Sequence, residues 1–122
     1  MPLVTSKEML LKAQEGHYAI GAFNVENMEM VQAVLEAATE LNAPVILQTT
    51  SSTVKYAGLP MYLANGSTRA NMAPVPAAMH LDHGNSFELC KDCIDGGFTS
   101  VMIDGSHLPY EENVALTKKV VD

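Results

Sequence analysis

The chain has 122 residues and a formal net charge of −7, and hydrophobic residues make up 48% of it. This length suits one domain or part of one, and the apolar content is too high for a disordered chain. The seven Lys and Arg are scattered rather than gathered into a basic patch, so we expect no nucleic-acid partner. The apolar runs fall far short of the ~20 residues that a membrane span requires, so we expect no membrane partner either.

Spacing and capping signals predict four helices in chain order. A capping box at residues 5–8 begins the first helix, in which the Thr5 hydroxyl and the Glu8 side chain serve each other's backbone donors, and Gly16 ends it. Ser86 caps a later helix that Gly96 and Gly97 interrupt. The helices are expected over residues 5–16, 27–41, 87–95 and 110 to the chain end.

Four short apolar runs between these helices predict buried strands. They lie at residues 18–23, 45–47, 77–81 and 100–103. Strands that alternate with helices favour an α/β fold with a parallel sheet and right-handed crossovers. We expect residues 1–122 to belong to one such domain, without a linker or a second domain.

The second crossover fits this alternation poorly. Residues 48–52 read as a polar loop rich in hydroxyl groups. Residues 62–76 occupy the place of a crossover helix, but Asn65-Gly66 and the polar residues after it predict a loop or an interrupted helix.

The C-x-x-C of Cys90 and Cys93 is expected to be structural. The N-terminal residues lack the charged and then apolar pattern of a secretion signal, so a cytoplasmic location and reduced thiols are expected. A redox pair needs its first Cys at a helix N-terminus, whereas Cys90 lies about one turn inside its predicted helix. We therefore expect two ordinary helix cysteines.

Polar groups gather where each predicted strand ends. Asn24, residues 48–51, Asp82-His83 and residues 104–107 all follow a strand directly. Since the carboxyl ends of parallel strands meet at one rim, these groups are expected to lie near one another. Strand ends are polar in many proteins without a site, so a purely structural rim stays open as an alternative.

The segment from His80 to Gly84, with sequence HLDHG, carries the strongest chemical signal. Strand alternation places His80 and Asp82 on one face and His83 just past the strand end. Imidazole suits zinc, and a neighbouring carboxylate suits general acid–base work. A hydrogen-bonded His–Asp pair without a metal is the plainer interpretation.

HLDHG resembles the H-x-D-H-G signature of the class II, zinc-dependent ketose-bisphosphate aldolases. Further matches in register support the resemblance, at residues 18–24, 43–47, 97–109 and 111–114. The resemblance implies a (β/α)₈ TIM barrel, of which this chain would cover a leading helix and about four βα units. It implies reversible aldol cleavage of fructose or tagatose 1,6-bisphosphate into two triose phosphates.

The same resemblance assigns roles to individual residues. Asp82 is similar to the proton donor and acceptor of the family, and His83 to one of three histidine ligands of the catalytic Zn²⁺. Asp104 resembles a secondary carboxylate near the metal. Asn24, Thr50 and Ser51 match residues that contact the sugar bisphosphate substrate. A homo-oligomer is implied as well.

The length departs from the family, because 122 residues cannot close an eight-stranded barrel of ~250 residues. The motifs that carry the other two zinc histidines are not found in the chain. A truncated, non-catalytic half-barrel that self-associates is therefore the alternative. A third possibility is a small metal- or phosphate-binding module unrelated to aldolases.

Overall fold

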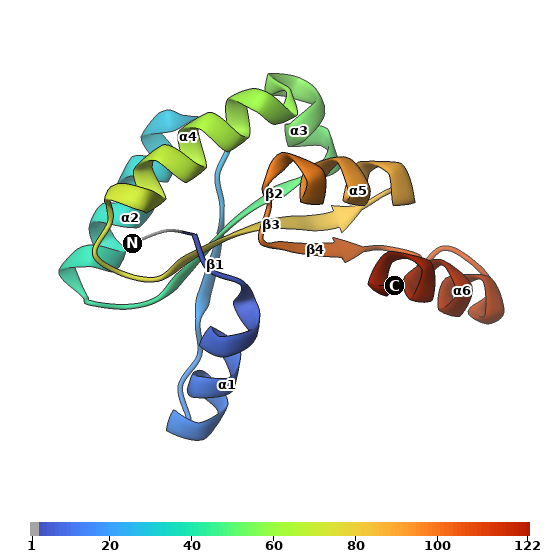
Figure 1. Cartoon of the computed structure of the whole chain (residues 1–122), viewed down its shortest axis with the longest axis horizontal. Coiled ribbons are helices and arrows are strands. Elements are labelled where there is room, and N and C mark those ends of the chain that lie inside the picture. Colours follow the sequence, from blue (N-terminus) through green and yellow to red (C-terminus); the bar gives the residue numbers. More distant parts are fainter. Residues whose placement is uncertain (1–2) are drawn as a thin grey trace.

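The computed structural model describes residues 3–122, and Met1 and Pro2, at the start of the segment considered for a secretion signal, lie outside it. Helices and strands alternate along the chain, except that two helices lie between the second and third strands (Figure 1). Within the described residues, no helix has the length and hydropathy needed to cross a bilayer. The elements are α1 (Ser6–Gly16), β1 (Gly21–Asn24), α2 (Met28–Glu40), β2 (Val45–Thr50), α3 (Ser51–Ala57), α4 (Leu59–Met72), β3 (Ala77–Gly84), α5 (Phe87–Gly96), β4 (Ser100–Ile103) and α6 (Tyr110–Val121).

The four strands form one parallel sheet in the order β1-β2-β3-β4, as the alternation predicts. Helices α2 to α5 lie together on one side of the sheet, and the sheet is not closed (Figure 1). The register pairs Asn24 with Gln48, Gln48 with His80, and Thr50 with Asp82. Side chains near the carboxyl ends of neighbouring strands therefore lie next to one another across the sheet.

Two apolar clusters hold the helices against the sheet. One joins α2 and the C-terminal part of α4 to β2, around Val31, Leu35 and Leu47. The other joins α3 and α5 to β3, around Leu81 and the two cysteines. Both clusters lie on the helix-covered face, because alternate residues of β2 and β3 point there.

The first strand is shorter than predicted and is not buried. It begins at Gly21 rather than at Tyr18, and all four of its residues are exposed. The prediction was wrong because β1 is an edge strand, paired on one side only. Its apolar side chains, such as the half-exposed Phe23, therefore lack a covering layer.

The second crossover is more regular than predicted. The polar residues 48–52 are the end of β2 and the first turn of α3, and residues 59–72 form the continuous helix α4. Tyr62, Gly66 and Ala70 make a buried stripe at four-residue spacing. A Cβ at Gly66 would lie 2.5 Å from Met79 Sδ, so the glycine lets α4 approach β3 closely. Tertiary packing thus overrides the low helix propensity of this segment.

The helix ends partly follow the predicted capping. The Ser86 hydroxyl accepts a hydrogen bond from the Leu89 amide at 3.1 Å, as predicted. Thr5 occupies the N-cap of α1, but its hydroxyl makes no capping bond. Helix α1 ends at Gly16, as predicted, and the residue in left-handed conformation that follows it is His17, with φ 53°.

Candidate functional site

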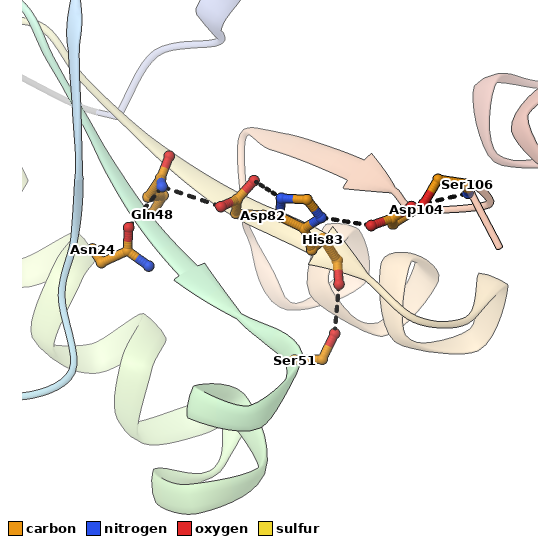
Figure 2. A network of polar contacts seen from close by, with 7 residues as sticks. All are labelled: Asn24, Gln48, Ser51, Asp82, His83, Asp104 and Ser106. Carbon is orange, nitrogen blue, oxygen red and sulfur yellow. Dashed lines mark hydrogen bonds and ion pairs between the residues drawn. The ribbon is translucent and has the colours of Figure 1, made fainter.

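The candidate site is a chain of hydrogen bonds, completed by an Asp82–His83 ion pair, across the carboxyl ends of the strands (Figure 2). Asn24 comes from β1, Gln48 from β2, Asp82 and His83 from β3, and Asp104 follows β4. The parallel register brings these groups to one rim, as the strand-end argument predicts.

Strand β3 ends irregularly, and this irregularity places His83. Pairing with β4 shifts register between Leu81 and Gly84, and His83 has a φ of 50°. Left-handed backbone at a residue with a side chain is uncommon and often marks a functional site. His83 belongs to the last residues of β3, whereas it was predicted to lie in the following loop. Its side chain projects into solvent.

Asp104 fixes the His83 imidazole. The His83 Nδ1–Asp104 Oδ2 distance is 2.6 Å, and the hydrogen bond raises the pKa of His83, with a further contribution from the Asp82 charge. Hydrogen bonds from Ser106 and His83 lower the pKa of Asp104. Its other oxygen, Oδ1, accepts the Ser106 amide at 3.0 Å. The carboxylate thus selects one ring nitrogen and leaves Nε2 facing Asp82, at 3.8 Å from Asp82 Oδ1.

Gln48 connects the Asp82 carboxylate to Asn24. Its Nε2 donates to Asp82 Oδ2 at 3.2 Å and to Asn24 Oδ1 at 2.8 Å. Asp82 is largely shielded, with a side chain 20% exposed, whereas His83 is 60% exposed. The rim therefore holds a sheltered carboxylate next to an accessible imidazole.

The two predicted hydroxyl residues take different places. Ser51 Oγ donates to the His83 carbonyl oxygen at 2.9 Å, which ties the start of α3 to the end of β3. Thr50 instead lies in a separate hydroxyl cluster, with its Oγ1 2.9 Å from Ser52 Oγ and 3.1 Å from Thr53 Oγ1. Five of the six predicted site residues thus share the network of Figure 2, and Thr50 does not.

His80 lies one step back along β3 and serves another contact. Its Nδ1 is 2.7 Å from Ser100 Oγ on β4, and burial lowers its pKa. Half-buried in this way, His80 supports the β3–β4 pair beneath the rim.

The residues present fit one ligand position of a metal site. An imidazole with Nδ1 held by a carboxylate and Nε2 free is the arrangement that second-shell carboxylates create around metal-binding histidines. Within residues 3–122, however, no group of three His, Cys, Asp or Glu side chains is placed to hold a metal ion. A complete site would need further ligands beside His83.

The cysteines take no part in this rim. Both are free and buried on the helix-covered face, and burial raises the pKa of Cys93 to about 11. A thiol with this environment is a poor nucleophile at neutral pH, which agrees with the structural role expected for the pair.

Gln48 and Ser106 are the two residues of the Figure 2 network that were not predicted as site residues, and of these Gln48 links two strands. It belongs to the strand-end group at 48–51, but no motif marks it. A usable signal exists: position 48 lies on the same face of β2 as Ile46 and Thr50 and is paired in register with both Asn24 and His80. A polar side chain between two polar neighbours on an open face is a candidate for a bridging role.

Comparisons with known proteins match almost the whole chain to one enzyme family. A family model described as class-II fructose-bisphosphate aldolase matches residues 4–122. A fructose-bisphosphate aldolase of Staphylococcus aureus is 52% identical over 125 residues, covering 100% of this chain and 44% of the relative. A 6-phospho-5-dehydro-2-deoxy-D-gluconate aldolase of Halalkalibacterium halodurans is 49% identical, with coverages of 99% and 43%.

Solved structures show the same likeness. The crystal structure of the YdjI aldolase from Escherichia coli K12 matches with a TM-score of 0.93 and 36% identity, over 98% of this chain and 46% of that one. A putative fructose-1,6-bisphosphate aldolase from Coccidioides immitis matches with a TM-score of 0.85 and 31% identity, over 93% and 45%. The chain spans less than half the length of these relatives, and its open sheet is part of a TIM barrel, as the resemblance implied. Over residues 4–122 the chain belongs to the class-II fructose-bisphosphate aldolase family.

Proposed function

We propose that this chain carries the acid–base carboxylate and one metal ligand of a class II ketose-bisphosphate aldolase. The observation that carries the proposal is the pair at the end of β3: a sheltered Asp82 next to an exposed His83 whose Nδ1 is held by Asp104. The reaction is the reversible cleavage of a ketose 1,6-bisphosphate into dihydroxyacetone phosphate and glyceraldehyde 3-phosphate. Fructose 1,6-bisphosphate is the first candidate substrate, since relatives of this chain are named fructose-bisphosphate aldolase. Tagatose 1,6-bisphosphate is the second candidate.

His83 would hold the metal through its free Nε2, and Zn²⁺ is the proposed ion because imidazole is a preferred zinc ligand. Catalytic zinc sites use about three protein ligands, so His83 alone does not complete the site. When bound, the metal supplies a Lewis acid that stabilises charge on the ketone oxygen. Asp104 keeps the imidazole in the tautomer that leaves Nε2 free.

The proton chemistry belongs to Asp82. In cleavage, Asp82 takes the proton of the C4 hydroxyl while the C3–C4 bond breaks, so that C4 becomes the aldehyde carbon and the electron pair passes to the dihydroxyacetone phosphate part. In condensation it returns that proton to the aldehyde oxygen. Asn24, Thr50 and Ser51 are the proposed substrate contacts. The proposed setting is the cytoplasm, with the protein acting as a homo-oligomer.

The test is zinc-dependent release of triose phosphate from fructose and tagatose 1,6-bisphosphate by the 122-residue chain. Asp82→Asn is expected to lower the rate by about 10²- to 10⁴-fold, the usual contribution of a positioned acid–base group. Asp92→Asn, an exposed carboxylate on α5, is the matched control and should leave the rate unchanged. Turnover that survives in Asp82→Asn would refute the role of Asp82, and no turnover by folded, zinc-loaded chain would refute catalysis by this chain alone.

The open edge of the sheet favours a second candidate, a non-catalytic half-barrel that self-associates. An apolar cavity of about 420 Å³ lies between β1 and α2, lined by Tyr18, Phe23 and Leu41 among others. These three side chains are 49%, 52% and 78% exposed. A compact dimer in sedimentation that Phe23→Asp converts to monomer, without aldolase turnover, is the outcome that this candidate requires. A monomer at all concentrations would contradict it.

A further inference from the structure

Gln48 holds a side-chain nitrogen that touches both the proposed base, Asp82, and a proposed substrate contact, Asn24. Nε2 lies 3.2 Å from Asp82 Oδ2 and 2.8 Å from Asn24 Oδ1. A primary amide nitrogen carries two hydrogens, so each acceptor receives one of them. Both hydrogens of the Gln48 amide nitrogen are therefore donated, one to a residue of β1 and one to a residue of β3.

The chemistry of Asp82 fixes the orientation of all three groups. An ionised carboxylate only accepts hydrogen bonds, so Gln48 must turn its nitrogen, not its oxygen, toward Asp82. The same nitrogen also donates to Asn24, so the Asn24 side chain must present its Oδ1 as the acceptor. The Asn24 Nδ2 consequently points away from Gln48 and keeps its donors for another partner (Figure 2).

The two Asp82 oxygens are made unequal by this arrangement. Oδ2 accepts the Gln48 amide, whereas Oδ1 faces the His83 Nε2 at 3.8 Å. A proton on Oδ2 would oppose the Gln48 donor, so Oδ1 is the oxygen left to exchange a proton.

We propose that Gln48 is a positioning residue, which holds Asp82 with Oδ1 available and turns the Asn24 amide so that its NH₂ group serves the substrate. The proposal rests on the proposed aldolase function for its kinetic consequence, but the orientation of the three side chains does not. Gln48 itself acts only through its two neighbours.

Two substitutions separate the orienting role from a merely structural one. Gln48→Glu keeps the shape and replaces the donor by an acceptor, so the Asn24 amide is expected to turn over and donate to the new carboxylate. Gln48→Met keeps the length and removes all hydrogen bonding, so Asn24 should lose its fixed orientation. Gln14→Glu, on the exposed side of α1, is the control for added charge.

The first readout is side-chain amide exchange, measured by NMR on the metal-free chain. Exchange of the Asn24 NH₂ hydrogens should slow about tenfold in Gln48→Glu, because they gain a hydrogen bond to a charged acceptor. It should stay fast in the wild type, in Gln48→Met and in Gln14→Glu. Equal Asn24 exchange in the wild type and in Gln48→Glu would overturn the proposal. If Gln48→Glu does not fold, the kcat of Gln48→Met tests the proposal instead.

The second readout is the steady-state kinetics of the zinc-loaded chain. Gln48→Met should lower kcat about tenfold, the effect of one lost hydrogen bond to a charged group, whereas Gln14→Glu should leave kcat unchanged. A normal kcat in Gln48→Met would overturn the positioning role while the aldolase proposal stands. Slowed Asn24 exchange in Gln48→Glu without turnover by the wild type would support the orientation while catalysis by this chain alone is refuted.

Discussion

The two faces of the sheet differ although the same strands build them. On the helix-covered face, Leu47 and Leu81 are 1% and 0% exposed. On the opposite face, their next neighbours Gln48 and Asp82 are only partly buried and carry the hydrogen-bond network. Because side chains alternate along a strand, stability and chemistry fall on different faces of the same segment. Substitutions on the two faces should therefore have separable effects.

The largest expected effect is on the helix-covered face. Leu81→Ala removes a fully buried side chain and should lower the free energy of unfolding by about 2–5 kcal/mol. Urea unfolding followed by circular dichroism measures this change. Leu41→Ala, at a side chain 78% exposed, should stay within about 0.5 kcal/mol. Equal losses at the two positions would show that the loss at Leu81 does not come from its burial.

A smaller effect is expected where the rim meets the packed face. A Cβ at Gly84 would lie 2.8 Å from the Met102 carbonyl oxygen and 2.8 Å from Cys90 Sγ, so Gly84→Ala should cost about 1–3 kcal/mol. Gly21→Ala on the edge strand meets only the Phe23 ring, which is 52% exposed and free to turn away. The same urea experiment should show little change at Gly21. A larger loss at Gly21 than at Gly84 would show that the edge is the tighter region.

The smallest expected effect is a pH dependence of opposite sign at two histidines. Burial lowers the pKa of His80 below 6.5, so the unfolded chain takes up this proton first and stability falls as the pH drops through 6.5. The pKa of His83 is raised above 6.5, so its contribution is present below pH 6.5 and is lost as the pH rises through the raised value.

Thermal or urea unfolding between pH 5 and 8, with a chelator present, separates these two contributions. His80→Gln should reduce the loss of stability on acidification, and His83→Gln should increase it. Parallel shifts in the two variants would show that the two imidazoles do not differ in environment.

The residues of the candidate site could be predicted where their position at the end of a predicted strand was enough to place them. Asp82, His83 and Asp104 follow strands whose apolar runs are plain, so their convergence at one rim follows from parallel pairing. The left-handed φ of His83 could not be predicted, because it arises from the irregular pairing of β3 with β4. That irregularity depends on contacts between strands and has no local sequence signal.

The features that the sequence did not predict share a different cause. Helix α4 contains Asn65-Gly66, which is unfavourable locally but lets the helix approach Met79. Gln48 has an ordinary sequence context, and its role exists only once β1 and β3 flank it. In each case the deciding partner lies on another element, so local propensity could not reveal it.

Each strand contributes a residue of the rim network at or just after its end: Asn24, Gln48, Asp82 and Asp104. Strand register sets the position of each residue, and one extra residue within a strand would move that side chain to the other face of the sheet. An insertion in a crossover leaves these positions unchanged. Codons can therefore be gained or lost between the strands with little consequence, whereas a single added codon inside β2 or β3 is expected to be as harmful as replacing Asp82 itself.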